Sequence, residues 1–422
     1  MTHPCFATLR FRAAGLAAAL TVAVVAGQLA AQQEWTRFRG PNGTGLSQAT
    51  NIPVTWTDKD YNWKVALPGI GHSCPVVWND KVFLTSADNQ TALRHVLAIS
   101  TADGRTLWER KYSSSTHTKH QLNSFASPTP TVDDQRAYFV WSSPEEYSVR
   151  AITHDGQEVW HRSLGPFVSQ HSCGTSPIIY GDLLVLNNDQ DGISFLVALN
   201  RHSGEPVWQV PRNSREVAYS TPCVYEPAGA PPELIFNSGA QGITSIDPAT
   251  GNKNWEIAVF DKRSVSSPVI AAGLILGTCG SGGGGNYVVA VRAGKADGSV
   301  QPEIAYKVTK SAPYVPTPVA KDDLVFLWSE QGVATCIRAA TGEVVWQQRI
   351  GGKFYGSPIC IGDRLYCIST DGEVVVIAAG PEYAELARNN LGDGSHSTPA
   401  VADGVLYLRT FSHLFSLGKK PG

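Results

Sequence analysis

The sequence of 422 residues predicts an all-β protein with the architecture of a single eight-bladed β-propeller. Its apolar segments are short, rich in Val, Ile, Leu and Tyr, and bounded by Gly, Asp, Asn and Pro, which is typical of strands joined by turns. A Ser/Thr-Pro pair or a close variant recurs eight times, and a turn followed by tryptophan recurs with it. Internal repeats of this length predict propeller blades, in which each repeat stacks on its neighbours.

The recurring proline marks the first strand of each unit. Successive prolines are separated by 53, 49, 45, 46, 50, 40 and 41 residues. They are Pro75, Pro128, Pro177, Pro222, Pro268, Pro318, Pro358 and Pro399. Eight units of blade size therefore follow one another along the chain.

The turn and the tryptophan form the second signature. It reads AISTADGRTLW, ALNRHSGEPVW, SIDPATGNKNW and CIRAATGEVVW in four units, and AITHDGQEVW is a shorter version. Glycine supplies the positive φ that such hairpins require. We expect each tryptophan in the outermost strand, filling the gap between sheets. A ligand-stacking surface is the alternative, but the same position in unit after unit favours an architectural role. The residues concerned are Trp63, Trp108, Trp160, Trp208, Trp255 and Trp346.

The two ends of the repeat region complement each other. The first unit starts at NWKVALPG, residues 62–69, which resembles an outer strand with no inner strands before it. The last unit has inner strands from Pro399 to Leu417 but no tryptophan strand after them. Pairing of the two would close the ring and hide two sheet edges. We therefore predict a propeller over residues 52–418, an N-terminal extension over 32–51 that lies against it, and a tail over 419–422.

Residues 1–31 have the pattern of a secretory signal peptide. Arg10 and Arg12 precede an apolar run from Ala13 to Ala26, and Leu29-Ala30-Ala31 offers a cleavage point before Gln32. The run is short for a membrane span of about 20 residues, although an uncleaved anchor is the alternative. No cysteine follows Ala31, so the pattern is not that of a lipoprotein. We expect an exported protein, periplasmic or extracellular, that does not span the membrane after cleavage.

Composition excludes several partners. The chain has 34 basic and 36 acidic residues, and loss of the two leader arginines makes the net charge about −4, so no nucleic-acid partner is expected.

Seven cysteines follow the leader, an odd number without a CxxC spacing, and their pairing is left open. They lie in apolar strand-like runs, so we expect buried thiols in a monomeric protein. They are Cys74, Cys173, Cys223, Cys279, Cys336, Cys360 and Cys367.

The repeat resembles a known family. The pattern A-x-D-x-x-T-G-x-x-x-W, with Ser/Thr-Pro before each inner strand, is similar to the tryptophan-docking repeat of pyrroloquinoline-quinone (PQQ)-type propellers. WTRFRGPNGTG, NSFASPTP, SPIIYGDLLVLNNDQDG and YSTPCVY resemble exported PQQ-like repeat proteins of planctomycete-type bacteria. The resemblance covers nearly all of the mature chain and implies its architecture more strongly than its activity.

Relatives of this fold differ in what they do. Quinoprotein dehydrogenases hold PQQ and Ca²⁺ on the central axis, an outer-membrane assembly lipoprotein binds protein partners, and some kinase sensor domains carry the repeat. This sequence has neither the adjacent cysteine pair frequent in the dehydrogenases nor a C-x-x-C-H haem motif. It also has no lipobox cysteine. We therefore expect a binding or scaffold module for an envelope protein, glycan or small ligand rather than an enzyme. The alternative is a PQQ- and calcium-dependent dehydrogenase that uses the central channel.

Loops that enter the inner strands face one mouth of the channel, where a ligand site would form. The alternative is that their side chains are ordinary loop residues bonded to neighbouring blades. The predicted site residues are His72, Asn123, His171, Tyr219, Arg263, Tyr314, Lys353, Tyr355 and His396, with Phe125 beside them.

Other motifs carry less chemistry. His72, His171 and His396 could hold a metal only if they converged, and we predict no metal site. NNDQDG, residues 187–192, is oxygen-rich but lacks the ligand spacing of a calcium loop, so a turn is expected. No G-x-S-x-G or H-E-x-x-H motif is present. GSGGGG, residues 280–285, precedes a strand rather than a helix, which excludes a phosphate loop. We predict a hairpin between the second and third strands of the fifth unit, closely packed against a neighbouring loop or a partner.

Overall fold

The structure is a computed structural model that describes residues 1–3, 35–214 and 216–420. Residues 1–32 and 33–422 form separate units. The predicted signal peptide, residues 1–31, lies outside the described residues beyond residue 3. Among the described residues, no helix has the length and apolar character needed to cross a membrane.

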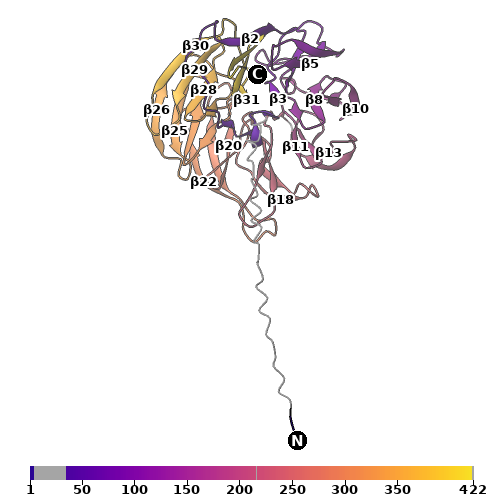
Figure 1. The fold of residues 1–422 in the computed structure, drawn as a ribbon, viewed down its shortest axis with the longest axis vertical. Coiled ribbons are helices and arrows are strands. Elements are labelled where there is room, and N and C mark those ends of the chain that lie inside the picture. The colour runs from indigo at the N-terminus through magenta and orange to yellow at the C-terminus, as the bar shows by residue number, and fades with distance from the viewer. Residues whose placement is uncertain (4–34, 215, 421–422) are drawn as a thin grey trace. The chain divides into compact units, whose positions relative to one another are not determined.

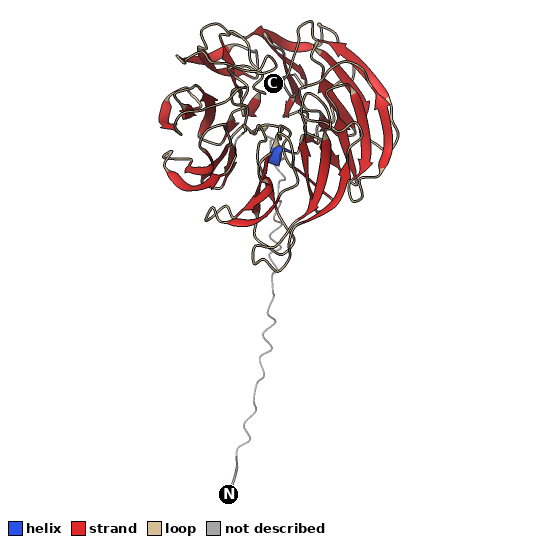
Figure 2. Ribbon diagram, turned by 180° about the vertical axis from the view of Figure 1, so that it is seen from behind, coloured by secondary structure: helices blue, strands red, loops and turns tan. Residues whose placement is uncertain are grey.

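The second unit is an eight-bladed β-propeller, as the sequence predicts. Eight sheets radiate from a central axis, seven with four strands and one with five (Figure 1). Figure 2 shows that strands make up nearly all of the regular structure. Within the described part of the chain, the 3-10 helix η1 (Pro41–Gly43) is the only helical element. The prediction of an all-β, eight-bladed propeller is confirmed.

The first four blades follow the chain from inner to outer strand. Blade 1 has β3 (Val76–Trp78), β4 (Lys81–Ala87), β5 (Arg94–Ser100) and β6 (Thr106–Tyr112). Blade 2 has β7 (Thr131–Val132), β8 (Arg136–Ser142), β9 (Tyr147–Thr153) and β10 (Glu158–Ser163). Blade 3 has β11 (Ile178–Tyr180), β12 (Leu183–Asn188), β13 (Ser194–Asn200) and β14 (Pro206–Arg212). Blade 4 has β15 (Cys223–Tyr225), β16 (Glu233–Ser238), β17 (Gly242–Ile246) and β18 (Lys253–Ile257).

The last four blades include both N-terminal strands. Blade 5 has β19 (Val269–Ala271), β20 (Leu274–Cys279), β21 (Tyr287–Arg292) and β22 (Glu303–Val308). Blade 6 has β23 (Val319–Lys321), β24 (Leu324–Trp328), β25 (Val333–Arg338) and β26 (Val344–Arg349). Blade 7 has β27 (Ile359–Ile361), β28 (Arg364–Ile368), β29 (Glu373–Ala378) and β30 (Glu385–Asn390), with β1 (Leu46–Ser47) added to β27. Blade 8 has β31 (Ala400–Ala402), β32 (Val405–Arg409), β33 (His413–Gly418) and β2 (Tyr61–Ala66).

Ring closure takes the predicted form. Strand β2 pairs antiparallel with β33, with Lys64 opposite Phe415, so the start of the chain supplies the outer strand of the last blade. The middle strands of each blade are buried on both faces, since adjacent blades cover them. All seven residues of β5 are buried, for example, whereas β6 at the rim is largely exposed. The core therefore consists of apolar layers between blades.

The residues before the inner strands form a closed ring of hydrogen bonds. Each backbone N–H donates to the side-chain hydroxyl or thiol of the next blade, over 2.9–3.3 Å. The members of this Ser/Thr ring are Cys74, Thr129, Ser176, Thr221, Ser267, Thr317, Ser357 and Thr398. A proline follows each member, which suits the first residue of an edge strand because proline has no N–H to pair.

The ring corrects one of the predicted strand starts. In Ser127-Pro128-Thr129-Pro130, the sequence pattern placed the second inner strand at Pro128. The structure begins β7 at Thr131, and Thr129 is the ring member. The equivalent proline is therefore Pro130, which follows Thr129. The N–H of Thr129 donates to the next blade, and its hydroxyl accepts from the preceding blade.

Tryptophans of the outer strands bond from one blade to the next. The Nε1 atoms of Trp63, Trp108, Trp160, Trp208 and Trp346 each donate to a backbone carbonyl of the following blade, over 2.8–3.0 Å. Tyr306 does the same from blade 5, where tryptophan is missing. Trp255 differs, since its Nε1 donates to the Glu233 carboxylate of its own sheet. A Cβ at Gly204 would lie 2.6 Å from the Trp160 ring, so this turn needs glycine for both space and its φ of 74°.

The segment Trp35–Ser47, here called the N-terminal strap, crosses the axis of the ring. The carbonyls of Trp35 and Thr36 accept bonds from β3 and β7, and β1 runs parallel to β27. Arg39 is fully buried and donates to the carbonyls of Thr317, Pro318 and Pro358 over 2.8–3.0 Å. Because it bonds inner strands on several sides of the ring, the strap closes one end of the channel. The strap, which is part of the N-terminal extension that the sequence predicts, is thus built into the propeller.

Candidate functional site

A cavity of about 480 Å³ occupies the other end of the channel. Its wall is built from loops of all eight blades, since each blade sends the segment before its inner strand toward the axis. Most of the Ser/Thr ring lines its base, and Phe38 of the strap reaches it from below. The propeller thus holds side chains from distant parts of the sequence around one space.

Eight of the nine predicted site residues line this cavity. They are His72, Asn123, His171, Tyr219, Arg263, Tyr314, Tyr355 and His396. Lys353 is exposed and lies outside the lining, because the loop turns so that Phe354 packs into the core and Tyr355 faces the cavity. Phe125 is buried behind the wall against Arg94. That the eight residues bind a ligand remains a prediction.

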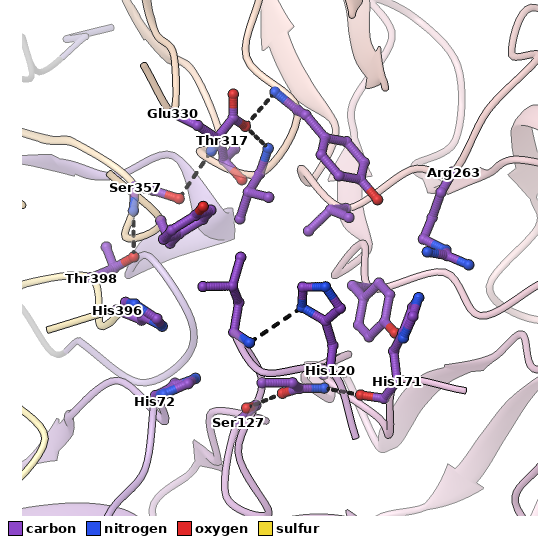
Figure 3. A pocket seen from close by; sticks show the side chains of 18 of the residues that line it. His72, His120, Ser127, His171, Arg263, Thr317, Glu330, Ser357, His396 and Thr398 are labelled. Carbon is purple, nitrogen blue, oxygen red and sulfur yellow. Dashed lines mark hydrogen bonds between the residues drawn. The ribbon is translucent and has the colours of Figure 1, made fainter. Parts of the chain in front are cut away.

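Two histidines form a pair on one side of the cavity. The ring centroids of His72 and His396 lie 4.6 Å apart (Figure 3). The ring centroid of Tyr355 lies 5.0 Å from that of His396. Burial lowers the pKa of His72 well below its usual value, and the nearby His396 and Arg409 lower it further. Burial also lowers the pKa of His396. Both rings are therefore neutral at pH 7.

A second histidine pair lies elsewhere on the wall. The rings of His120 and His171 are 4.9 Å apart, and Asn123 Nδ2 donates to the His171 carbonyl over 2.6 Å. The three histidines considered as metal ligands are thus divided between the two pairs. Across the described ranges, no three His, Cys, Asp or Glu side chains are arranged to hold a metal ion.

The remaining charged groups lie apart from the His72–His396 pair. Figure 3 shows Arg263 and His171 on one side of the cavity and His72 and His396 on the other. Glu330 is buried, and its Oε1 accepts the backbone N–H groups of Tyr314, at 2.6 Å, and Val315. Burial raises the pKa of Glu330 despite these bonds. This carboxylate therefore holds the wall together.

The glycine run forms the predicted hairpin between β20 and β21 and lines the cavity through Ser281, Gly282 and Gly284. The tip is not closely packed against a neighbouring loop, since a Cβ at Gly282 or Gly284 would meet no atom within 4 Å. Packing of the tip against a partner stays a prediction. Gly284 and Gly285 have φ of 90° and 69°, and Lys262 Nζ donates to both carbonyls over 2.9 and 3.0 Å. Glycine is needed here for turn geometry, and it leaves the cavity wall free of side chains.

Several lining residues were not predicted. Phe38 lies in the strap, and His120 and Leu122 lie in the long loop before blade 2. Glu330 and Gln331 follow the buried end of β24 rather than preceding an inner strand. The WTRFRG motif around Phe38 and the unusual length of the loop before blade 2 are visible in the sequence. Nothing in the sequence, however, places either segment at the axis of the propeller.

Two other motifs have structural roles. In NNDQDG, the buried Asp189 carboxylate lies 3.3 Å from the Arg212 guanidinium, so the segment is tied to its own blade. All seven cysteines that follow the leader are free and buried. Residues 187–192 do not line the cavity. Of the seven cysteines, Cys74 lines it, as a member of the Ser/Thr ring.

Comparison with known proteins places this ring of blades in a family. Residues 62–278 and 284–412 match the model of a family described as outer membrane protein assembly factor BamB. The chain belongs to the BamB family. The resemblance to PQQ-like repeat propellers is confirmed, and the two matched segments leave out residues 279–283 of the glycine hairpin. A comparison with curated proteins finds no match.

Solved structures with this fold include a BamB protein and dehydrogenases. BamB from Moraxella catarrhalis has 16% identity and a TM-score of 0.60, over 85% of this chain and 97% of that chain. A europium-containing methanol dehydrogenase has 11% identity and a TM-score of 0.69, over 92% and 98%. A quinohemoprotein alcohol dehydrogenase from Comamonas testosteroni has 12% identity and a TM-score of 0.65, over 92% and 81%. At these identities the likeness shows the fold alone.

Proposed function

We propose that the protein is a binding module whose axial cavity takes a small organic ligand. The observation that carries this proposal is a set of unpaired polar atoms in the wall. Tyr219 Oη, Arg263 Nε and His396 Nδ1 are buried and make no hydrogen bond of good geometry with a described residue, although Ser169 lies near Tyr219 and the Leu122 backbone near His396. A buried polar group left unpaired costs about 1–3 kcal/mol. A ligand that pairs with these atoms would recover that free energy on binding.

The wall suits a ligand with both apolar and hydrogen-bonding parts. Phe38, Leu122, Val265 and Val315 contribute apolar surface, and hydroxyls of the Ser/Thr ring contribute polar atoms. Its volume is within the range of about 300–1,000 Å³ typical of small-molecule pockets. Among the described lining residues, no hydroxyl or thiol is hydrogen-bonded to a histidine ring, as an activated nucleophile would require. The arrangement supports binding rather than catalysis.

A PQQ- and calcium-dependent dehydrogenase is the second candidate, favoured by the fold of the two dehydrogenases. Ca²⁺ takes six to eight oxygen ligands, with carboxylates prominent among them. Glu330 is the only carboxylate among the described lining residues, and its Oε1 is already bound to two backbone N–H groups. This donor set does not fit a calcium-bound quinone, so we derive no redox step and place the dehydrogenase second.

We further propose that the protein acts outside the cytoplasm, where an envelope protein or glycan could serve as its partner. The leader pattern of residues 1–31 supports export. Membership of the BamB family supports a role in the cell envelope.

Titration calorimetry on the chain without residues 1–31 tests the proposal. The probes are glucose, N-acetylglucosamine, 2-naphthamide and 2-naphthoate, and PQQ with Ca²⁺ is the competing ligand. We expect at least one of the four probes to bind, and Tyr355→Ala to weaken that binding while Lys353→Ala, at the exposed neighbour, leaves it unchanged. Binding of PQQ with Ca²⁺ coupled to dye reduction would contradict the proposal, as would the absence of binding by all four probes.

A further inference from the structure

One part of the cavity wall carries positive charge. Arg263 is the only Lys or Arg among the described residues that line the cavity. Its loop lies between β18 and β19, and its carbonyl accepts the N–H of Gly280 over 3.1 Å at the base of the glycine hairpin. The guanidinium is therefore anchored through its backbone to the strand pair β20–β21, while its side chain faces the cavity (Figure 3).

The guanidinium has no saturating partner. The nearest carboxylate, Glu216, lies 4.0 Å from Nε and is 60% exposed, so water screens that pair. The Arg263 side chain is only 22% exposed; it lies within hydrogen-bonding reach of the Tyr314 phenol, while its Nε makes no hydrogen bond with a described residue. Glu330, the carboxylate of the wall, is occupied by backbone N–H groups. Charge and hydrogen-bonding capacity at Arg263 are thus left for another group.

Three further hydrogen-bonding side chains, Tyr219, Tyr314 and His171, line the same cavity as this guanidinium. Burial raises the pKa of Tyr219 and Tyr314, and the charge of Arg263 opposes that rise in both. Burial and then Arg263 lower the pKa of His171. At neutral pH the two phenols and the neutral imidazole can all donate hydrogen bonds beside the guanidinium. Such a convergence of donors around one cation is suited to an oxyanion.

The glycine hairpin keeps the approach to Arg263 open. Ser281, Gly282 and Gly284 line this part of the cavity, and a Cβ at Gly282 would meet nothing within 4 Å. Ser281 and Gly282 lie in the stretch 279–283 that the family match leaves out. The open wall at this hairpin provides space for a ligand group.

Resting on the proposed function, we infer that Arg263, Tyr219, Tyr314 and His171 form an anion subsite for the carboxylate or phosphate of an organic ligand. The flat apolar body of that ligand lies across the cavity, over Phe38 and toward Tyr355 and His396. Phe38, Val265 and Val315 give the cavity apolar lining, which suits the body of an aromatic or alicyclic acid. Charge-assisted bonds would give the anionic group most of the selectivity.

Matched probes separate charge from shape. We would titrate the chain without residues 1–31 with 2-naphthoate, 2-naphthyl phosphate and the neutral 2-naphthamide. Naphthamide has nearly the shape of naphthoate but no charge. We expect at least one of the two anions to bind about 10- to 100-fold more tightly than naphthamide. The better of the two identifies the acid group as carboxylate or phosphate.

Variants assign the preference to the subsite. Arg263→Met should abolish the preference for the anion, Arg263→Lys should retain part of it, and Lys353→Met, which removes an exposed cation outside the cavity, should leave it intact. Unchanged melting temperatures and far-ultraviolet spectra show that each variant is folded. Should Arg263→Met not fold, Tyr219→Phe is the second variant and should reduce the preference severalfold.

Two results would overturn the inference. One is equal affinity for naphthoate, naphthyl phosphate and naphthamide in the unmodified protein. The other is an anion preference that survives in folded Arg263→Met. If Arg263→Met does not fold, an unaltered anion preference in Tyr219→Phe counts as this second result. Failure of all three naphthyl probes would also overturn it, whereas sugar binding that Tyr355→Ala weakens would leave the proposed function standing.

Discussion

The two ends of the central channel use the same residue type in opposite ways. At the strap end, Arg39 is fully buried, and its guanidinium is saturated by three backbone carbonyls of two blades and two of the strap itself. At the cavity end, Arg263 faces an open space with an unpaired Nε. Burial lowers the pKa of Arg39 to about 9, but its carbonyl partners keep the group in place. A saturated arginine stabilises the fold, and an unsaturated one is available for binding.

The largest effect should come from removing the aromatic anchor of the strap. Trp35 is completely buried in the largest apolar cluster. We expect Trp35→Ala to lower the free energy of unfolding by about 3–5 kcal/mol, because a large cavity remains. Trp35→Phe should lose less. Urea denaturation followed by fluorescence measures both, and an unchanged midpoint for Trp35→Ala would show that the strap is dispensable.

The comparison of the two arginines can be tested directly. We expect Arg39→Met to lower the free energy of unfolding by about 3 kcal/mol, since three buried carbonyls lose their donor. Arg263→Met should change it by less than about 1 kcal/mol, because no hydrogen bond from its Nε is lost. Chemical denaturation of both variants gives the values. Equal losses would remove the distinction between the two ends.

Acid should weaken the cavity end. Burial first, and then His396 and Arg409, lowers the pKa of His72 below its unfolded value, so the folded state binds fewer protons than the unfolded state. The contribution of neutral His72 to the free energy of unfolding is fully present above the unfolded pKa of about 6.5. It is lost as the pH falls below that value. Thermal unfolding from pH 7.5 to 5 should show the decline. His72→Phe should flatten it, and an unaltered slope in that variant would assign the decline to other groups.

Ligand affinity should respond to pH in the opposite direction. A bound anion favours protonation of His171. Burial, Arg263 and His120 lower the pKa of His171, whereas a hydrogen bond to the Gln170 backbone carbonyl and the charge of Asp191 raise it. We expect naphthoate to bind severalfold more tightly at pH 5.5 than at pH 7.5, since it stays ionised there. Naphthamide should show no such gain. Calorimetry at both pH values decides, and His171→Gln should remove the effect.

The smallest effect is expected at the hairpin tip. Gly282→Ala should change stability by less than about 0.5 kcal/mol, because its Cβ would contact nothing. The matched change Gly204→Ala, at a φ of 74° against the Trp160 ring, should cost more than about 1 kcal/mol. Melting temperatures of the pair measure the contrast. A large loss at Gly282 would mean that the hairpin is packed in solution.

Sequence patterns predicted most of the architecture because they repeat. Ser/Thr-Pro pairs and tryptophan turns recur once per blade, and their spacing led to eight blades and to the closing strand at Trp63. The shift from Pro128 to Pro130 marks the limit of that reasoning. Two prolines stand close together there, and only the hydrogen bonds of Thr129 with neighbouring blades distinguish them.

The sequence by itself determined the blades, their order and the loops that face the axis, since these follow from local periodicity and turn chemistry. Only the tertiary structure decided which end of the channel is closed and which groups are left unpaired. Arg39 and Arg263 are indistinguishable as letters in a sequence. They differ because closure of the ring places one among carbonyls from distant strands and the other beside a cavity, and such contacts have no local signature.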